Sequence, residues 1–304
     1  MITVLGSINM DLIAKVDGFP KPGETVRGLA FATSAGGKGA NQALAARRAG
    51  ADVLLFGAVG RDRFAEPALA LLKSEGVDLE SIRTVDEATG IALIQVDSTG
   101  ENEITVVSGA NWCIDRIDAA YAVQQMKTGD HLLMQMEIPA DALEVALTNA
   151  RKAGVTSLLN IAPFTADAAG LAGLADVVIA NENEFGQLCG KTGMVIEKIE
   201  SELKSMHDET GQTVIVTLGG DGVIAARHGQ ISRIAAMEVD TVDTVGAGDT
   251  FCGYFAAGLD GGMDIDAALQ RAAIAASLAC MNEGAQPAIP TARDTDAALE
   301  IFVK

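Results

Sequence analysis

A stretch near the C-terminus, DTVGAGDTFCGYF (residues 243–255), places two glycines and an aspartate before an apolar segment. Backbone amides at a helix N-terminus lack partners and carry partial positive charge, and glycine lets an anion come close to them. Gly246, Ala247 and Gly248 could therefore hold phosphate oxygens. Asp249 could accept the proton of an alcohol that attacks the phosphate. The alternative is that Asp249 or the following threonine only caps the helix.

A second glycine-rich segment, SAGGKGANQ (residues 34–42), stands before another helical pattern. Its lysine is followed by Gly39 rather than by serine or threonine, so the segment is not a Walker A phosphate loop. Glycines around Lys38 would let the backbone approach a polar ligand, with Lys38 and Asn41 as hydrogen-bond donors. An ordinary loop before a helix is the alternative, but it does not explain three glycines around one lysine.

The first apolar stretch of the chain leads into GSINMD (residues 6–11). A dinucleotide-binding loop would need G-x-G-x-x-G here, and the single glycine argues against a nucleotide-dependent dehydrogenase. Asn9 and Asp11 alternate outward at the predicted strand end, and an amide beside a carboxylate can bind neighbouring hydroxyl groups. These residue types suit a sugar, although a plain polar turn would have the same composition.

Polar residues also follow two later apolar stretches. Glu137 ends LLMQME and is costly to bury without a partner. Asn181 and Glu184, in ANENEF, are three residues apart and lie close to one helical face, from which they could orient phosphate and metal-bound water. The alternative for this pair is a capping box at a helix start.

The segment TLGGDGV (residues 217–223) again has glycines after an apolar stretch. Thr217, Gly219 and Gly222 would suit the phosphate or sugar of a nucleotide, or a simple turn. Each cluster is a weak signal alone, but together they fall at predicted strand ends, where open α/β sheets bind ligands. Their residue types divide into groups suited to hydroxyls, to a metal nucleotide and to transfer between the two.

Alternating apolar runs and helical patterns are expected to position these residues. The predicted strands are 2–6, 53–59, 131–136, 155–160, 177–180 and 214–218. The predicted helices include 38–48, 64–74, 141–151, 197–207, 247–259 and 265–282. This order predicts an α/β fold, a doubly wound and mainly parallel sheet flanked by helices.

Two segments interrupt the alternation. Residues 11–33 contain a Pro/Gly turn, and residues 89–107 contain two alternating runs around a central turn, so both are typical of antiparallel hairpins. We expect them to form a small β-sheet lid over the strand ends, with ordinary surface hairpins as the alternative. A third hairpin is predicted at 222–234. No linker or repeat divides the chain, so residues 1–304 are expected to form a single domain.

The overall charge limits the classes of partner. The 304 residues include 22 basic and 41 acidic side chains, a net charge of −19 that would repel nucleic acid and anionic membranes. A nucleotide can still bind through local donors, and we expect it to arrive with a divalent cation. The apolar runs are shorter than the roughly 20 residues that cross a bilayer. Four scattered cysteines without a secretion signal argue against a zinc site and favour a cytoplasmic location.

Taken together, the motifs resemble those of the carbohydrate and nucleoside kinase family that contains the ribokinases and the bacterial phosphofructokinase-B type. GGKGANQALAARRAGADVLLFGAVG (residues 36–60) and DTVGAGDTFCGYFAAGL (residues 243–259) are similar to its two signatures. The resemblance runs from Val4 to Pro290. It implies a ribokinase-like α/β body with a β-sheet lid, through which two subunits form a homodimer.

The resemblance also implies an activity. The expected reaction is transfer of the γ-phosphate of ATP to the primary hydroxyl of a small-molecule sugar, with ribose as the acceptor and ribose 5-phosphate as the product. A kinase for another sugar or for a nucleoside is the alternative. A non-catalytic sugar-binding regulator is a further alternative, but a regulator would not need a base and a metal support together.

Matching residues take their implied roles from the family. Asp249 matches the catalytic base, and the anion hole matches Gly246, Ala247 and Gly248. Sugar contacts match Asn9, Asp11, Gly37, Lys38, Asn41 and Glu137, and lid positions over the sugar match Ala92, Ile94 and Val106. The element that supports phosphate and Mg²⁺, the latter through water, matches Asn181 and Glu184, and the nucleotide loop matches Thr217, Gly219 and Gly222. A monovalent-cation site, expected to hold K⁺, matches Asp243 and the Val245 carbonyl, completed by carbonyls within 280–288.

Three positions depart from the residues usual in ribokinases. Ile161 stands where proline is usual, Cys252 where asparagine is usual, and Ala273 where many have histidine or asparagine beside the adenine. None of these departures removes a catalytic group. They leave the identity of the sugar and the nucleotide preference open.

Overall fold

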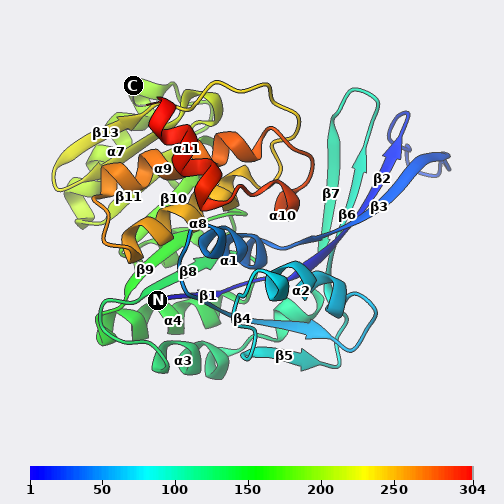
Figure 1. Cartoon of the computed structure of the whole chain (residues 1–304), viewed down its shortest axis with the longest axis horizontal. Coiled ribbons are helices and arrows are strands. Elements are labelled where there is room, and N and C mark those ends of the chain that lie inside the picture. Colours follow the sequence, from blue (N-terminus) through cyan, green and yellow to red (C-terminus); the bar gives the residue numbers. More distant parts are fainter. Residues whose placement is uncertain (303–304) are drawn as a thin grey trace.

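The strands form two sheets in the computed structural model, which describes residues 1–302 (Figure 1). The larger sheet has nine strands, β1 (Ile2–Leu5), β4 (Val53–Gly60), β5 (Ile82–Val85), β8 (His131–Gln135), β9 (Thr156–Asn160), β10 (Val177–Asn181), β11 (Thr213–Thr217), β12 (Val223–Arg227) and β13 (Gln230–Ile234). The smaller sheet has four, β2 (Asn9–Val16), β3 (Gly28–Gly36), β6 (Gly90–Val96) and β7 (Asn102–Val107).

The larger sheet is mainly parallel, as the apolar runs predict. Its order is β13-β12-β11-β10-β9-β8-β1-β4-β5, and only the pairs β11–β12 and β12–β13 are antiparallel. The chain adds strands on one side of β1 and then on the other, so the sheet is doubly wound and its order reverses at β1. Ligands of open α/β sheets bind at such a reversal. The ends of β1 and β8 therefore lie where a site is expected.

Helices cover both faces of this sheet. One face is covered by α1 (Lys38–Arg48), α2 (Ala65–Ser74), α8 (Ala247–Asp260) and α9 (Ile265–Ala279), whose apolar side chains share one core with the sheet. A second core joins the other face to α3 (Arg116–Gln124), α4 (Ala140–Ala153), α5 (Ala168–Ala172), α6 (Glu182–Leu188) and α7 (Ile196–Thr210). Shorter or peripheral segments are the 3₁₀ turns η1 (Gly109–Cys113) and η2 (Gly219–Asp221), with α10 (Ala285–Ala288) and α11 (Ala292–Phe302). No helix within residues 1–302 is long and apolar enough to cross a membrane.

Helices α1 and α8 pack unusually closely because small residues face each other. A Cβ atom added to Gly253 of α8 would lie 2.5 Å from the carbonyl oxygen of Gln42 and from Cβ of Ala45, both on α1. Helix α8 is apolar on all sides and ten of its residues are buried, which is typical of a helix inside a core. The close contact brings the start of α8 beside the start of α1.

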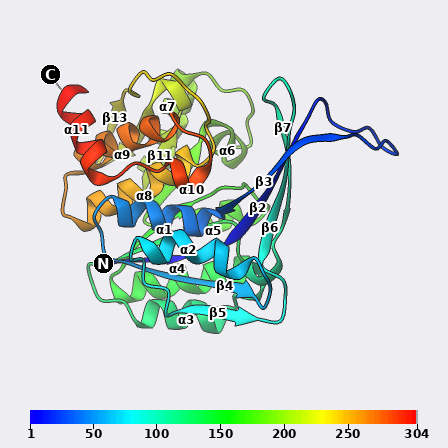
Figure 2. The same cartoon turned by 45° about the vertical axis from the view of Figure 1, so that its right-hand side comes forward.

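The smaller sheet is the predicted lid. Its order is β3-β2-β6-β7, with two antiparallel hairpins joined by the parallel pair β2–β6. Figures 1 and 2 show the four strands projecting beyond the α/β body. Strand β2 begins at Asn9, four residues after β1 ends at Leu5. Strand β1, at which the order of the larger sheet reverses, thus runs almost directly into β2, an inner strand of the lid.

Candidate active site

Asp249 lies in the first turn of α8 and is only 7% exposed. Gly246 precedes the helix in a left-handed conformation (φ 78°), and no side chain caps the helix. The carboxylate instead accepts hydrogen bonds from Asn41 Nδ2 and Gln42 Nε2, both at 2.9 Å. The helix-cap alternative is therefore wrong for Asp249. The Ala247 amide donates to the Thr244 carbonyl at 3.3 Å, whereas the Gly246 and Gly248 amides have no acceptor among residues 1–302 and could meet an anion.

Lys38 is the first residue of α1 and supplies positive charge beside this carboxylate. The Asp249 carboxylate is the main reason that the pKa of the Lys38 ammonium is raised, because burial acts in the opposite direction. The carboxylates of Glu137 and Glu184 raise this pKa further. The charges of three carboxylates from different parts of the chain thus act on one ammonium group.

Asp11 completes the acidic cluster from the side of the lid. Burial raises the pKa of this carboxyl group to about 7, and the nearby charges of Glu137 and Asp249 contribute. Asn9 is buried next to it, and its Oδ1 accepts a 2.7 Å hydrogen bond from Asn111 Nδ2. The Asn111 side chain, which sequence analysis did not assign to the site, also accepts the Ile8 amide at 2.8 Å.

Glu137 is half-buried and has hydrogen-bond partners for its carboxylate. Its Oε2 accepts the Lys38 amide at 3.1 Å and the Ser7 hydroxyl, so the carboxylate faces the start of α1. The space beside two glycines of this segment is filled by protein rather than by a ligand. Added Cβ atoms would lie 2.7 Å from the Asn9 amide nitrogen at Gly37 and 2.5 Å from that of Ser7 at Gly39.

The three lid positions expected over the sugar lie on one face of the lid. Ala92 pairs with Asp11 on one side and with Val106 on the other, so the three side chains point the same way. Ile94 is two residues further along β6 and therefore shares this face. The lid thus presents an apolar surface beside the Asp11 carboxyl.

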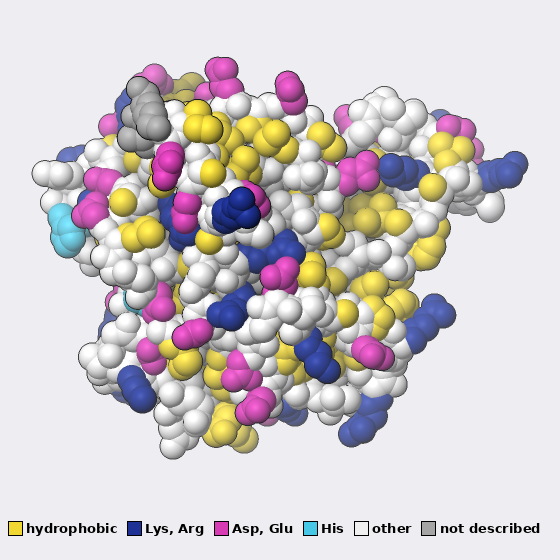
Figure 3. Space-filling model, in the orientation of Figure 1, with side chains coloured by type: hydrophobic (Ala, Val, Ile, Leu, Met, Phe, Trp, Pro, Cys, Tyr) yellow, Lys and Arg dark blue, Asp and Glu magenta, His cyan; other side chains and the backbone are white. Residues whose placement is uncertain are grey.

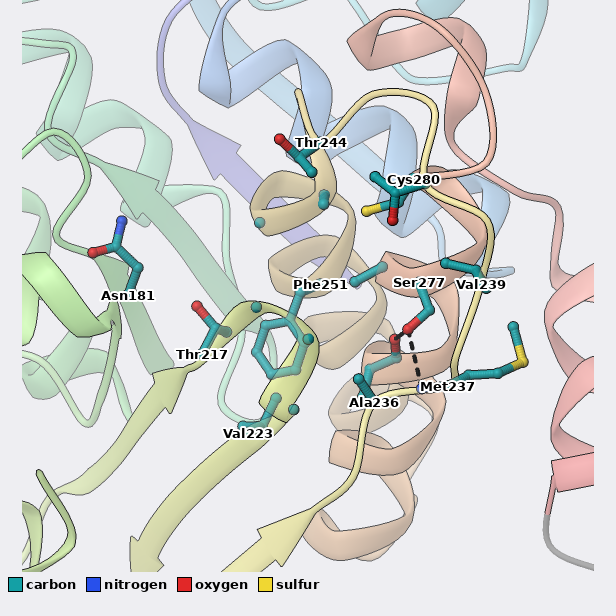
Figure 4. Close-up of a pocket in the computed structure, with 18 of the residues that line it drawn as sticks. Asn181, Thr217, Val223, Ala236, Met237, Val239, Thr244, Phe251, Ser277 and Cys280 are labelled. Carbon is teal, nitrogen blue, oxygen red and sulfur yellow. Dashed lines mark hydrogen bonds between the residues drawn. The ribbon is translucent and has the colours of Figure 1, made fainter. Parts of the chain in front are cut away.

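A groove of about 980 Å³ lies next to the cluster, between α8, α9 and the ends of β10 and β11 (Figure 4). Four residues predicted to bind the nucleotide line it, Asn181, Thr217, Gly219 and Gly222, and at α8 it reaches Ala247 and Gly248. Since the first turn of α8, with the Gly248 amide, lines the groove, a phosphate chain could reach Asp249 from it.

Asn181 and Glu184 form the capping box that was the alternative interpretation. The Asn181 amide donates to Glu184 Oε2 at 2.9 Å, and the Glu184 amide donates to Asn181 Oδ1 at 2.8 Å. Burial raises the pKa of Glu184, opposed by this hydrogen bond and by Lys38. Glu184 does not line the groove itself, so any contact with a nucleotide would need a bridging water or ion.

The apolar wall of the groove could not be assigned from the motifs. It includes Met237 and Val239, which lie in a segment without helix or strand, and Ala276 and Ser277 of α9. The Ser277 hydroxyl accepts the Met237 amide at 3.2 Å and donates to the Ala273 carbonyl at 3.0 Å (Figure 4). Small residues at helical spacing along α9 are the only sequence signal of this wall.

Comparison with known proteins identifies the family. The model of the pfkB family of carbohydrate kinases matches residues 1–292. The chain belongs to this family. The ribokinase of Haemophilus influenzae is 39% identical over 298 residues, 97% of this chain and 96% of the relative. The deoxyribokinase of Salmonella typhi is 32% identical over 292 residues, 95% of each protein. The structure of Arabidopsis thaliana ribokinase complexed with ribose and ATP aligns with a TM-score of 0.90 and 31% identity, covering 98% of both chains.

The segments expected to hold a monovalent cation meet in this carbohydrate kinase. Asp243 accepts the Val245 amide at 3.0 Å and the Gly284 amide at 2.9 Å. The Cys280 carbonyl accepts the Val242 amide at 2.8 Å and the Asp243 amide at 3.2 Å. Within residues 1–302, no three acidic, histidine or cysteine side chains cluster as metal ligands. A cation here would therefore depend mostly on backbone carbonyl oxygens.

The three departures from the usual ribokinase residues have different surroundings in this kinase. Ile161 is fully buried in the core on one face of the sheet, and Ala273 lines the groove. Cys252 is 1% exposed in the other core, and burial holds the pKa of its thiol well above the usual value, with a further contribution from Asp249. Cys252 is therefore a protonated, apolar packing residue behind the base.

Proposed function

We propose that this kinase phosphorylates ribose at its primary hydroxyl, with ATP as the donor and ribose 5-phosphate as the product. One observation supports this most directly. The Asp249 carboxylate bonds to Asn41 in the expected sugar segment, while Ala247 and Gly248 just before it line the groove. The ribokinase names of similar proteins, one of them solved with ribose and ATP, support ribose as the acceptor.

In the proposed reaction Asp249 accepts the proton of the primary hydroxyl. The hydroxyl oxygen forms a bond to the γ-phosphorus as the bond from this phosphorus to the β–γ bridging oxygen breaks, and ADP leaves with that electron pair. Amides of residues 246–248 would stabilise charge on the transferring group, and the Lys38 ammonium, whose charge interacts with that of Asp249, would add to this field. The work is therefore mostly positioning and electrostatics.

Sugar recognition would come from two directions. The carboxyl groups of Asp11 and Glu137 and the amides of Asn9 and Asn41 suit hydroxyl groups, and all four lie in segments that meet near the start of α1. The apolar lid face would cover the sugar and exclude water. Gly37 would contribute through its position at the start of α1.

The protein atoms available as cation ligands indicate which cation each site suits. Mg²⁺ keeps several waters and binds substrate phosphates, so it suits a site whose only protein support is the Asn181–Glu184 pair. Mg²⁺ supplies neutralisation of the phosphate charge when bound. For K⁺ we propose the Asp243–Val245 segment together with carbonyls within 280–288, because these segments offer oxygen atoms as cation ligands and meet through Asp243.

We further propose a homodimer formed through the lid. Phe31 is 69% and Leu93 is 44% exposed, and both lie on the lid face opposite to Asp11. Figure 3 shows hydrophobic side chains gathered on the lid. A second lid would cover such side chains. Four free cysteines agree with the cytoplasm as the place of action, where ATP is available.

The proposal is tested by measuring ADP release with ribose, deoxyribose, ketohexoses and nucleosides, each with K⁺ or with Na⁺. Ribose should give the highest kcat/KM, and K⁺ should raise it. A higher kcat/KM for deoxyribose would favour the activity named for the Salmonella relative. A preference for nucleosides would overturn the ribose assignment, and no turnover with any acceptor would favour a binding protein.

A further inference from the structure

Three buried side-chain amides are linked by hydrogen bonds to one another and, through Gln42, to Asp249. The reaction described so far gives these amides no part. Gln42 Nε2 donates to Asp249 Oδ1 at 2.9 Å and to Asn160 Oδ1 at 3.1 Å. Gln135 Nε2 donates to Gln42 Oε1 at 2.7 Å. The three amides come from α1, β8 and β9, and both glutamines are fully buried. Three amide side chains in an apolar core are costly unless each is hydrogen-bonded.

The hydrogen bonds among these amides fix the orientation of the Gln42 side-chain amide. Because Gln135 donates to Oε1, the Nε2 group of Gln42 must point toward Asp249 and Asn160. Asn160 in turn donates to the Ile179 carbonyl at 3.2 Å, which leaves its oxygen as the acceptor for Gln42. The orientations of Gln42 and Asn160 are thus determined by their partners at both ends of the amide, and the last acceptor is the Asp249 carboxylate.

We propose that Gln42 is a positioning residue for the catalytic base, an inference that rests on the proposed role of Asp249. Gln42 bonds to Oδ1 and Asn41 bonds to Oδ2, so the two donors restrain the carboxylate from rotating about Cβ–Cγ. The other lone pairs of the carboxylate remain available to accept the hydroxyl proton. Gln42 has no exposed surface and therefore reaches the substrates only through Asp249.

The variant Gln42→Met tests the role, since methionine has a similar length and no amide donor. We expect kcat to fall on the order of 10- to 100-fold, because a small misplacement of a catalytic group has costs of this size. The KM values for ribose and for ATP should change less than about threefold. A folded variant with kcat within about twofold of the parent, or with its loss mainly in KM, would overturn the proposal.

Gln212→Met is the matched control. Gln212 is also a buried glutamine, whose Nε2 donates to the carbonyls of Ala172 and Ala175 at 2.6 and 2.5 Å, on the other side of the sheet. Its variant should lower Tm and leave kcat unchanged. If Gln42→Met does not fold, Gln42→Glu keeps the acceptor for Gln135 but lacks the donor, and the same loss of kcat is expected.

A double variant separates this role from the base assignment itself. If Gln42 acts only through Asp249, then Gln42→Met should cause no further loss in an Asp249→Asn background. Multiplicative losses would mean that Gln42 acts elsewhere, which would overturn the positioning role. Near-normal turnover of Asp249→Asn alone would instead overturn the proposed base, and the positioning role with it.

Discussion

Asn41 of α1 and Asp249 of α8 are 208 residues apart in the sequence and are joined by a 2.9 Å hydrogen bond. This bond connects the two segments that carry the family signatures. Because α1 and α8 pack closely at Gly253, the expected sugar ligand Asn41 and the proposed base Asp249 are held in a fixed position relative to each other. The expected effects of substitutions follow from this shared geometry.

The first prediction concerns Asp249→Asn. The variant keeps the shape of the side chain but cannot accept the hydroxyl proton, so kcat should fall by ~10²–10⁴-fold. The Kd for MgATP, measured by titration calorimetry, should stay close to that of the parent because the carboxylate faces Asn41 and Gln42. The exposed Asp167 gives a control variant, Asp167→Asn, with unchanged kcat. Normal turnover in Asp249→Asn would contradict the base assignment.

The second prediction is a pH effect of Asp11. Its carboxyl has a pKa of about 7 in the folded protein and of 3.8 when unperturbed. Between these values the folded state keeps a proton that the unfolded chain has released, so stability falls as the pH rises from about 4 to about 7. Asp11→Asn removes this loss, and its Tm relative to the parent should therefore increase from pH 5 to pH 8.

Thermal unfolding of the ligand-free protein across this pH range checks the sign. The exposed lid residue Asp17 gives the control, because Asp17→Asn should leave the difference in Tm independent of pH. Parallel Tm curves for Asp11→Asn and the parent would show that Asp11 titrates at its ordinary value.

The third prediction concerns the apolar wall of the groove. Ala276→Leu adds bulk to a residue that lines the groove, so the KM for ATP should rise about tenfold while the KM for ribose is unchanged. Ala267→Leu is the control on the same helix, because Ala267 is exposed and does not line the groove. Steady-state kinetics with each substrate varied in turn distinguish the two variants. An equal rise in both KM values would place the effect outside the nucleotide site.

The fourth prediction concerns assembly. A charged residue at an apolar contact is costly to bury, so Phe31→Asp combined with Leu93→Asp should convert the proposed dimer to a monomer. Analytical ultracentrifugation at micromolar concentration measures the change. Thr25→Asp, an exposed polar position in the loop between β2 and β3, should leave the dimer intact. A parent protein that already sediments as a monomer would contradict the proposal.

The sequence predicts the framework well because its signals are local. Continuous apolar runs such as those of β1 and β8 and the alternating runs of β6 and β7 each identify a strand type without knowledge of the partners. Short strands and helices with weak patterns, such as β5 and α3, do not stand out in the same way. Boundaries shift by a few residues, as where α9 ends at Ala279 rather than at 282.

The supporting residues of the site are different because their partners are distant in sequence. Gln42, Gln135 and Asn160 are single polar residues inside buried segments, and nothing in their neighbours reveals that they bond to one another. The place of Asn111 in the site is likewise visible only from its hydrogen bond to Asn9, which is 102 residues away in the sequence. The sequence allows a helix-cap interpretation at the start of both α8 and α6. It is wrong at α8, where no side chain caps the helix, and correct at α6, where Asn181 does.

The division of the site between two sheets has a consequence for how such enzymes diverge. Ala92, Ile94 and Val106 belong to the lid, whereas Asp249, Lys38 and the groove belong to the body. With the proposed roles of these residues, substitutions on the lid would alter which acceptor is enclosed without disturbing the groups proposed to move the phosphate. A fold built in this way can acquire a new acceptor in small evolutionary steps, each of which leaves the chemistry in working order.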